Sequence, residues 1–340
     1  MFRAIAKTRR DKVHKRTASG LAVVVLVLCV VLAPVVRERW ASHAQMFFAE
    51  QRDLPAHAPA RTVVSISTFS RRVFNMRGCL ESVFSQSQRP DRIIVSIPKK
   101  FRVLEATTGT DAADYIRRNE TELDLVAWFS EYTGVTPVYR VNVNVHKTSY
   151  VYDMGILTVQ FLDDDPWGPA TKLVGALLLE TDPETVIITL DDDLAYHRDT
   201  VQWLSTHIQP GIALSFGCEM WRVDKRDFID WTVGYRLDAR YFYMPTPRVC
   251  AGWLCGWTGV AYHVSSFRAD VYVFLQTLPA GCFNNDDMWL SGYLVRQGVT
   301  RIYAPGILKH GTDYKTLGLS LSAIVNYREK GYSCGRHLFP

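Results

Sequence analysis

The stretch from Thr185 to Leu194, TVIITLDDDL, constrains the fold of this chain more tightly than any other. Val186 to Leu190 are apolar or β-branched without alternation, which is typical of a strand buried on both faces of a parallel sheet. Three adjacent carboxylates follow at once, and because they repel one another and need water they cannot continue a buried strand. The stretch therefore predicts an α/β fold with an acidic triplet, Asp191, Asp192 and Asp193, just past the carboxyl end of a buried strand.

The carboxyl edge of an open α/β sheet is where such folds bind their ligands. Carboxylate oxygens suit a hard divalent cation such as Mg²⁺ or Mn²⁺, and the cation would in turn hold a phosphate-bearing ligand. The alternative is that the triplet is only a solvated turn or the cap of the next helix. The triplet in isolation leaves both interpretations open, so the neighbouring motifs decide between them.

Charge and composition exclude one class of partner. The chain has 340 residues, of which 48% are hydrophobic and 21% charged, as in ordinary globular proteins. The net charge of +5 is concentrated in the basic head at residues 1–19, and the remainder is close to neutral. We therefore expect no nucleic-acid partner, because that function requires a basic face on the folded domain.

The N-terminal region predicts attachment to a membrane. Residues 20–36, GLAVVVLVLCVVLAPVV, lack charged side chains and would span about 25 Å as a helix. A cleaved signal peptide is the alternative, but its apolar core is usually shorter. We expect a single-pass type II anchor in a Golgi or endoplasmic reticulum membrane, with residues 1–19 cytoplasmic, a stem at 37–60 and a lumenal catalytic domain at 61–340.

Cysteine usage fits a lumenal domain. Six cysteines follow the predicted anchor, so disulfides are plausible, but the sequence does not show their pairing because six cysteines allow 15 connectivities. The pair at Cys250 and Cys255 lacks the second pair or histidine partners of a zinc site.

The remaining periodicities place the elements around the triplet. A strand from Thr62, a helix around Met76 to Gln86 and a strand from Arg92 to Pro98 predict a parallel strand–helix–strand unit. Residues 102–134 predict a helix or two, and the second acidic triplet, 163–165, is interpreted as a loop because no apolar run precedes it. Further elements are predicted at 138–145 (strand), 168–178 (helix), 200–207 (helix), 212–216 (strand) and 301–304 (strand).

Two motifs between these elements carry side chains suited to a ligand. Lys172 lies in the first helical turn after Gly168, where a cation gains nothing from the helix dipole. Its position is better explained by an anionic partner, either the acidic triplet or a ligand phosphate, with a surface lysine as the alternative. Trp253 and Trp257 lie among glycines, and we expect one of them to stack on a sugar, although either alone is more typical of a core.

A second acidic motif begins the last predicted helix. In CFNNDDMWLSGYLVRQG, Asn284 or Asn285 is the expected N-cap, and Asp286 and Asp287 fill the first turn. Acids are common there because they favour the dipole, but the placement also keeps a carboxylate ionised and directed outward, as a general base requires. His310 follows the final strand, from which it could reach a metal.

Taken in order, the opening strand, GPATK, LDDD, the Gly/Trp segment, DDMWLSGYL and the trailing histidine resemble glycosyltransferases of the GT-A fold. The resemblance covers residues 62–310 and is closest to the family-2-like set. It implies a Rossmann-like, mostly parallel central sheet flanked by helices. It also implies a nucleotide-sugar donor, with a UDP-sugar as the expected one, and a glycan or glycoprotein acceptor.

The resemblance also implies roles for individual residues. Asp191 and Asp193 would hold Mn²⁺ or Mg²⁺ with His310 as the C-terminal ligand, and Asp192 would meet the ribose or sugar of the donor. Asp287 matches the carboxylate that deprotonates the acceptor hydroxyl in inverting members, with Asp286 beside it. The pair is Asp-Asp where Glu-Asp is frequent, which leaves open which of the two is the base, and a retaining enzyme would need neither.

The sequence thus predicts a metal-dependent glycosyltransferase. One alternative is a non-catalytic lectin-like or chaperone protein on the same fold, which would keep the aromatic contacts without metal chemistry. The other is a metal-dependent nucleotidyltransferase, which could share the strand-end carboxylates but gives no particular role to the Trp/Gly segment.

Overall fold

The computed structural model describes residues 54–99, 121–219 and 246–304, together with Cys334 and Leu338. All of them belong to one compact unit, Glu50–Pro340. The predicted tail, membrane anchor and most of the stem lie outside the described residues, as does His310. Among the residues that are described, no helix combines the length and the apolar character needed to cross a bilayer.

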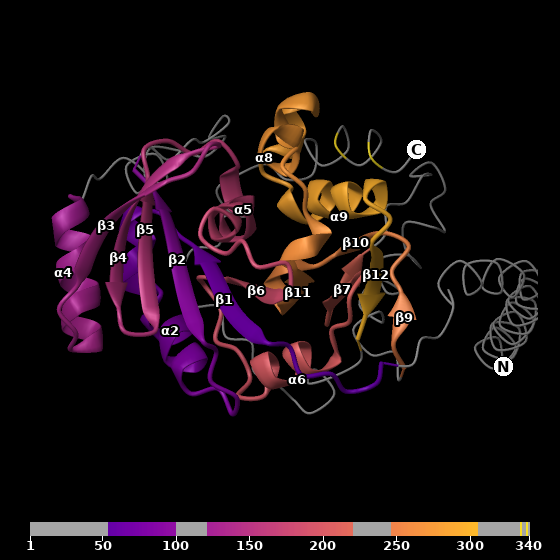
Figure 1. The fold of residues 1–340 in the computed structure, drawn as a ribbon, viewed down its shortest axis with the longest axis horizontal. Helices are drawn as coiled ribbons and strands as arrows, with labels where there is room; N and C mark the ends of the chain where they lie inside the picture. Colours follow the sequence, from indigo (N-terminus) through magenta and orange to yellow (C-terminus); the bar gives the residue numbers. More distant parts are fainter. Residues whose placement is uncertain (1–53, 100–120, 220–245, 305–333, 335–337, 339–340) are drawn as a thin grey trace, which may run out of the picture. The chain divides into compact units, whose positions relative to one another are not determined.

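A large mixed sheet forms the centre of this unit (Figure 1). The described strands follow the order β3-β4-β5-β2-β1-β6-β11-β7-β12-β9. The pairs β5–β2, β2–β1, β1–β6 and β7–β12 are parallel, whereas β4, β11 and β9 run against their neighbours. The main strands are β1 (Arg61–Ser67), β2 (Arg92–Pro98), β5 (Leu157–Leu162), β6 (Thr185–Asp191), β7 (Ile212–Ser215), β11 (Val260–His263) and β12 (Thr300–Tyr303). The predicted mostly parallel α/β sheet is therefore confirmed.

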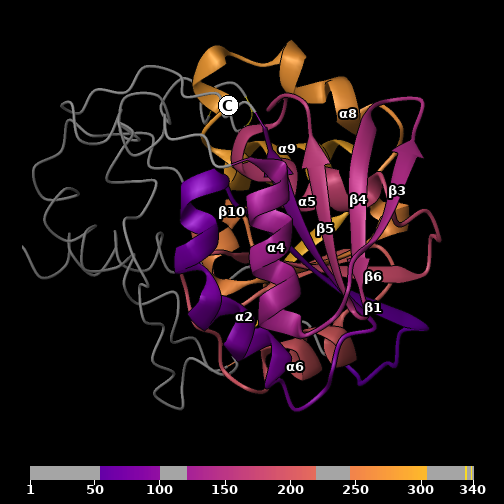
Figure 2. The same ribbon diagram turned by 90° about the vertical axis from the view of Figure 1, so that its left-hand side faces the viewer.

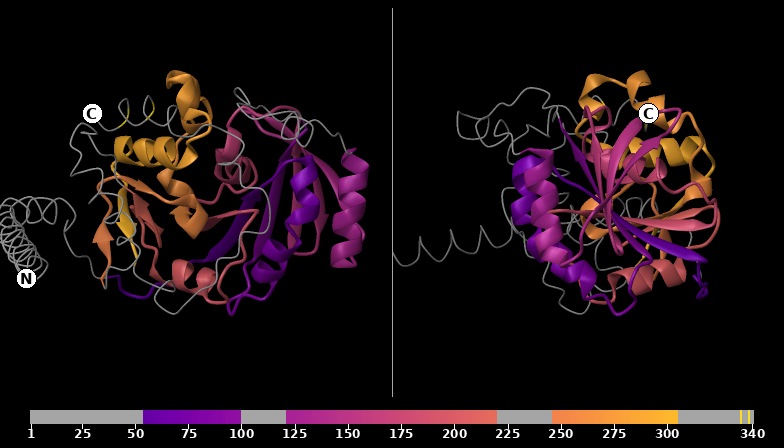
Figure 3. Two further views of the ribbon diagram at one scale, coloured as in Figure 1. Left: turned by 180° about the vertical axis from the view of Figure 1, so that it is seen from behind. Right: turned by 60° about the vertical axis from the view of Figure 1, so that its left-hand side comes forward.

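Burial on both faces explains why the central strands lack alternation. In β6, Ile187 belongs to one hydrophobic cluster and Val186 and Ile188 belong to the other, on the opposite face. The first cluster is covered by α5 (Thr171–Leu177), α8 (Val271–Phe274) and α9 (Asp286–Arg296), and the second by α2 (Arg77–Phe84), α4 (Glu122–Thr133) and α6 (Thr200–His207). Figures 2 and 3 show the sheet between these two layers of helices.

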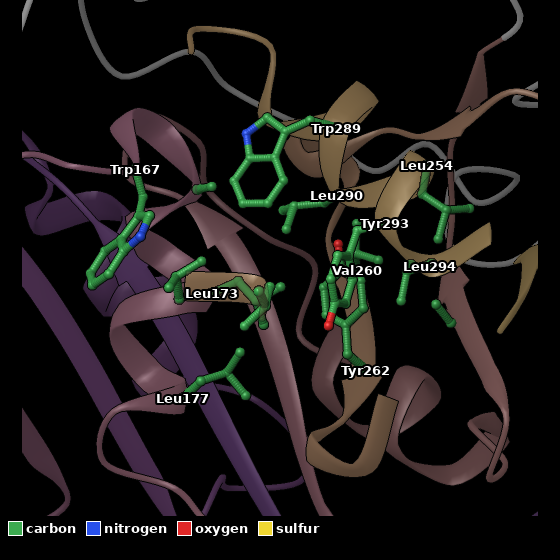
Figure 4. Packing of buried hydrophobic residues seen from close by; sticks show 14 of the residues in the cluster. Trp167, Leu173, Leu177, Leu254, Val260, Tyr262, Trp289, Leu290, Tyr293 and Leu294 are labelled. Atoms are coloured by element: carbon green, nitrogen blue, oxygen red, sulfur yellow. The ribbon is translucent and has the colours of Figure 1, made fainter. Parts of the chain in front are cut away.

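Aromatic and leucine side chains fill the first layer. Trp289 and Tyr293 of α9 are fully buried and pack toward Leu173 of α5, with Tyr262 of β11 beneath them (Figure 4). Rings of this size bury large apolar areas, so this layer fixes α9 against α5 and β11. The arrangement matters for the site because Lys172 lies in the first turn of α5 and Asp286 is the first residue of α9.

The predicted strand–helix–strand unit is confirmed, since β1 and β2 are parallel and flank α2 in the sequence. The chain returns to the other side of β1 as β6, whose residues pair in register from Arg61↔Thr185 to Ser67↔Asp191. Connections from β1 and β6 thus leave in opposite directions along the sheet. Such a topological switch point opens a crevice at the carboxyl ends of the two strands.

One margin of the sheet differs from the prediction. The alternating segment is strand β3 (Val138–Val143), but it is followed by β4 (Thr148–Met154) and by β5, neither of which was predicted. All six residues of β5 are buried, so a buried strand does precede the 163–165 triplet, although Gln160 interrupts its apolar pattern. The triplet itself lies in a loop, as expected.

The remaining described elements are short. Strand β11 was not predicted: it lies antiparallel between β6 and β7, and the turn that leads into it, η4 (Gly256–Thr258), therefore reaches the carboxyl edge of β6. The others are β8 (Cys218–Glu219), β9 (Arg248–Val249), β10 (Trp253–Leu254), η1 (Ser70–Asn75), η2 (Gly168–Ala170), η5 (Val264–Ser266), η6 (Leu275–Thr277) and η7 (Ala280–Cys282).

Two disulfides, Cys218–Cys250 and Cys282–Cys334, join segments within this unit. The expectation of disulfides among the six cysteines after the predicted anchor is confirmed for these four. Cys79 and Cys255 are buried free thiols. The Cys282–Cys334 bond fixes the chain four residues before Asp286, the first residue of α9.

An ion-pair network links β1, β2, β3 and β4. Glu180, which is buried, accepts from Arg61 of β1 at 3.0 Å and from Arg92 of β2 at 3.0 Å. Arg92 also reaches Asp153 of β4 at 3.0 Å, and Arg140 of β3 reaches the other oxygen of Asp153 at 2.7 Å. The network therefore links four strands through alternating charges.

Removing the carboxylate at its centre is expected to be costly. Glu180→Gln leaves the guanidinium of Arg92, which is only 16% exposed, with Asp153 as the remaining one of its two carboxylate partners, and we expect the free energy of unfolding to fall by about 2–3 kcal/mol. Chemical denaturation of the full chain measures this. Glu81→Gln is the control, because its i,i+4 pair with Arg77 is exposed, and a change above about 0.5 kcal/mol is not expected there. Equal losses in both variants would contradict the prediction.

Candidate active site

The acidic triplet lies at the topological switch point, as its position after β6 predicts. Ser67, at the end of β1, is the register partner of Asp191. The three carboxylates differ in exposure: the side chains of Asp191, Asp193 and Asp192 are 30%, 15% and 8% exposed, in that order. Their partners differ too, so the triplet is not a uniform solvated turn.

Asp192 and Asp193 face the segment that follows β1. Nη2 of Arg72 lies 2.6 Å from Oδ1 of Asp192 and 2.9 Å from Oδ2 of Asp193. Thr68 donates its hydroxyl to the other oxygen of Asp192 at 2.6 Å. Both oxygens of Asp192 thus have protein partners in this structure, and its predicted contact with the donor stays a prediction.

Burial and like charge set the electrostatics of this half of the site. Burial raises the pKa of Asp192 to about 6, with Asp193 and Asp191 adding to the rise, while Arg72 and Thr68 oppose it. For Arg72, burial acts to lower the pKa, but the carboxylates of Asp192, Asp193 and Asp191 outweigh it and the pKa is raised. Arg72 therefore stays a cation and compensates part of the negative charge of the triplet.

The third carboxylate of the triplet pairs with Lys172. The ammonium of this lysine lies 2.6 Å from Oδ1 of Asp191 and 3.0 Å from Oδ2 of Asp286, the first residue of α9. Lys172 is only 5% exposed, so the surface-lysine alternative is wrong and the expected anionic partner is present. One buried cation thus joins the strand-end triplet to the acidic pair of α9.

Local backbone geometry holds Lys172 in place. Pro169 lies at the start of η2, the single turn that leads into α5, and the hydroxyl of Ser65 in β1 donates to the carbonyl of Lys172. Gly168 has φ +55°, and a Cβ there would lie 2.7 Å from the carbonyl oxygen of Phe283. Only glycine permits both the left-handed backbone and this approach, so GPATK is the motif that brings α5 against the segment before α9.

Asp287 lies beside the same ammonium but is more accessible than Asp286. Its side chain is half-buried, whereas Asp286 is 6% exposed. Burial and the neighbouring Asp286 raise the pKa of Asp287 well above its usual range, while Lys172 and a hydrogen bond from the backbone of Gly256 oppose the rise. A raised pKa is the property that allows a carboxylate to accept a proton near neutral pH.

Gly256 closes this part of the site. A Cβ at this position would lie 2.4 Å from Oδ1 of Asp287 and 2.9 Å from the Lys172 ammonium. A real Cβ atom does not approach its neighbours this closely, so the space beside Asp287 exists because residue 256 has no side chain. The Gly/Trp segment therefore contributes backbone to the site, as its glycines predict.

The start of α9 differs from the prediction in two details. Asn285 is the N-cap residue, but its side chain caps nothing and instead donates to the carbonyl of Gly281 at 2.7 Å. Asp286 does not point outward, because it is buried and directed at Lys172. The prediction of an outward-directed carboxylate was wrong for Asp286, and the half-buried Asp287 is the accessible member of the pair.

The two tryptophans of the Gly/Trp segment occupy different environments. Trp253 is 6% exposed and belongs to the first hydrophobic cluster, as expected of a core residue. Trp257 is half-buried, and its carbonyl accepts from the hydroxyl of Tyr196 at 3.3 Å. That same hydroxyl accepts from the backbone N–H of Asp191 at 2.7 Å, so Trp257 is the tryptophan whose segment is tied to the triplet.

The donor set of the triplet fits a hard cation. Asp191 and Asp193 offer oxygen ligands that reach solvent, and Mg²⁺ or Mn²⁺ commonly binds one or two carboxylates and completes its coordination with water and substrate phosphates. Within the described ranges, no group of three or more His, Cys, Asp or Glu side chains is placed so that it could hold a metal ion. The expected third ligand, His310, lies outside those ranges.

Sequence reasoning missed Arg72 and Thr68. Both follow β1, and they contact the triplet only because β1 and β6 are neighbours with Ser67 opposite Asp191. The signal that would have identified them is the switch-point rule: polar residues just after the first strand belong to the same crevice as those after β6.

Comparisons with known proteins find only distant likenesses, all of them to solved structures. No protein-family model and no curated protein matches the chain. Among solved structures it is similar to a mannosyltransferase from Pyrobaculum calidifontis in complex with GDP-Man and Mn²⁺, with 16% identity, a TM-score of 0.40, and coverage of 83% of this chain and 65% of that one. It is also similar to the galactosyltransferase LgtC in complex with donor and acceptor sugar analogs, with 9% identity, a TM-score of 0.35, and coverage of 70% of both chains.

A third similar structure is residues 1–349 of TarS from S. aureus, with 11% identity, a TM-score of 0.36, and coverage of 75% of this chain and 59% of that one. TM-scores below 0.5 describe a distant likeness from which no activity follows. The large, mainly parallel sheet flanked by helices fits the GT-A architecture by its own topology.

Proposed function

We propose that this protein is a metal-dependent glycosyltransferase, which moves a sugar from a nucleotide-diphosphate donor to a hydroxyl of a glycan or glycoprotein acceptor. The observation that supports it best is the position of Lys172. Its buried ammonium contacts Asp191 at the end of β6 and Asp286 at the start of α9, so two acidic motifs that are far apart in the sequence form one site.

The triplet is the donor half of the proposed site. Asp191 and Asp193 would hold Mg²⁺ or Mn²⁺, and the bound ion would supply Lewis-acid stabilisation of the charge on the departing diphosphate. The donor would enter at the switch-point crevice, where Arg72 adds a second positive charge. A UDP-sugar is the donor that we propose, from the family resemblance.

Asp287 is the acceptor half. Its half-buried carboxylate lies beside the space left by Gly256, and its raised pKa suits it to accept the proton of an attacking hydroxyl. The accessible position favours Asp287 over Asp286 as the base, because Asp286 is buried against Lys172. The chemistry would be an in-line displacement at the anomeric carbon.

We further propose that the domain is lumenal in the Golgi or endoplasmic reticulum, anchored by residues 20–36. The two disulfides support an oxidising compartment, since such bonds are rare in the reducing cytosol. The uncharged run of residues 20–36 supports the anchor.

Thermal shift of the full chain tests the donor site. With Mn²⁺, one nucleotide sugar from a panel is expected to raise the Tm by roughly 5 °C at a hundredfold excess over its Kd. Chelator and Asp193→Ala are each expected to abolish the shift. Asp164→Ala is the matched control, because this exposed carboxylate belongs to the loop triplet and pairs with Lys147.

The outcomes separate the three functions. A shift that needs both Mn²⁺ and Asp193, with nucleoside diphosphate released on turnover, supports a glycosyltransferase. Release of pyrophosphate would select a nucleotidyltransferase. If the protein is folded but no nucleotide raises its Tm, or if the rise is equal in Asp193→Ala, the metal-bridged donor site is contradicted. Either result would favour the non-catalytic alternative.

A further inference from the structure

The acidic site carries its own counter-ions. Its five carboxylates are those of Asp191, Asp192, Asp193, Asp286 and Asp287. Two buried cations, Arg72 and Lys172, lie among them. Each of the two expected metal ligands is already paired, Asp193 with Arg72 at 2.9 Å and Asp191 with Lys172 at 2.6 Å. A divalent cation therefore does not enter an unpaired set of carboxylates.

Arg72 is held firmly in this position. It lies in η1, the short helix that follows β1, and is 7% exposed. Its backbone N–H donates to the carbonyl of Phe69 at 2.8 Å, and its guanidinium lies 5.5 Å from the centre of the Phe69 ring. A guanidinium stacked on a ring and paired with two carboxylates has little freedom to move aside without a new partner.

A divalent cation that arrives alone meets an electrostatic obstacle. To bind Asp193 it must lie close to the guanidinium of Arg72 or push it from the carboxylate, and at the low effective dielectric of a buried site the repulsion between like charges is strong. Displacing the guanidinium removes one of the two carboxylates that compensate its burial. Either route weakens cation binding.

A diphosphate removes that obstacle. Its oxygens can accept two parallel hydrogen bonds from the planar guanidinium, the bidentate pairing that arginine prefers, and they also complete the coordination of the cation. The diphosphate brings its negative charge together with the positive charge of the cation. Arg72 can therefore pair with the diphosphate when the cation binds Asp193.

We propose that Arg72 is a positioning residue that couples cation binding to nucleotide binding: it shields Asp192 and Asp193 in the empty site and turns to the diphosphate when the cation arrives. This inference rests on the proposed function, because it assigns Arg72 to the same donor site. Its consequence is that free Mn²⁺ binds weakly and that a nucleoside diphosphate strengthens Mn²⁺ binding through Arg72.

Direct Mn²⁺ titration of the full chain, followed by electron paramagnetic resonance of the free ion, tests the coupling without an activity assay. The probes are Mn²⁺ alone and Mn²⁺ with a saturating nucleoside diphosphate, UDP or GDP. For the wild type we expect the nucleotide to lower the Kd of Mn²⁺ roughly tenfold or more. Linkage requires Mn²⁺ to lower the Kd of the nucleotide by the same factor, which a separate titration checks.

The variants assign that coupling to Arg72. In Arg72→Met we expect Mn²⁺ alone to bind several-fold more tightly than in the wild type, and the effect of the nucleotide to shrink to about twofold. Arg72→Lys keeps the charge and is expected to restore most of the coupling. Arg77→Met is the matched control, because Arg77 is exposed on α2 and pairs only with Glu81 among the recorded ion pairs of the described residues.

Arg72→Gln is a second variant without the charge, and the test needs only one of the two neutral variants to fold. Circular dichroism verifies the fold of each. Coupling in the wild type below twofold, or coupling in the neutral variants equal to that of the wild type, would overturn the role of Arg72 while leaving the metal site intact. If the wild type bound no Mn²⁺ with or without nucleotide, and Asp193→Ala behaved identically, the donor site itself would be refuted.

Discussion

Asp287→Asn is expected to lower kcat for sugar transfer by roughly 10²–10⁴-fold, while the Kd of the donor changes little. The amide cannot accept the proton of the acceptor hydroxyl, yet it keeps the size of the carboxylate in the space beside Gly256. Release of nucleoside diphosphate, with and without acceptor, measures the loss. Donor binding by thermal shift shows that the site is still formed.

Asp286→Asn is the informative partner of this experiment. Asp286 is buried against Lys172, so we expect its replacement to weaken donor binding and stability together with activity. Asp287→Asn with full activity would remove the proposed base. A loss of kcat confined to Asp286→Asn, with stability unchanged, would transfer the role to its neighbour.

Lys172→Met is expected to have the largest effect on stability, a loss of about 3–5 kcal/mol in the free energy of unfolding. The methionine fills the space of the lysine stem but leaves Asp286, which is 6% exposed, without its cation, beside Asp191 and Asp287. Carboxylates that are buried together and uncompensated repel one another. Urea denaturation of the full chain measures the change.

A double variant assigns the cause of that loss. If repulsion between carboxylates is responsible, Lys172→Met combined with Asp286→Asn is expected to be more stable than the sum of the single effects predicts. Lys147→Met is the control, because its partner Asp164 is 57% exposed, and we expect a change of under about 1 kcal/mol. Strict additivity in the double variant would contradict the bridging role of Lys172.

The sequence predicts well the elements whose burial is simple. Strand β2 and helix α6 have the predicted bounds, Arg92–Pro98 and Thr200–His207, and β6 ends at the acidic triplet as expected. The two strands are buried on both faces, and the helix has a local apolar pattern. Local sequence is therefore sufficient to predict these segments, and distant residues are not needed.

Strand β5 was missed because a polar residue interrupts its apolar pattern. Gln160 is completely buried, but it donates to the hydroxyl of Ser149 at 2.9 Å and accepts from that of Ser96 at 2.9 Å. These partners come from β4 and β2, the two neighbours of β5 in the sheet. A buried glutamine is acceptable only when such partners exist, and their presence depends on a strand order that a linear pattern does not contain.

The candidate site shows the same division. The acidic triplet and the pair at the start of α9 carry enough charge to be recognised in the sequence, and Lys172 was singled out because a cation is unexpected in a first helical turn. Arg72 lacks such a local signal. Its role depends on two strands lying side by side, which the tertiary structure alone determines.

The antiparallel entry of β11 between β6 and β7 makes the site dependent on late events in chain synthesis. A nascent chain that has produced β1 to β6 already contains Lys172 and the triplet, but it still lacks the Gly256 turn and the acidic pair of α9. Contacts between such distant segments form slowly and after local structure. Tight nucleotide binding would thus require that the last third of the polypeptide has folded. A donor analogue would therefore detect completed folding as well as an active site.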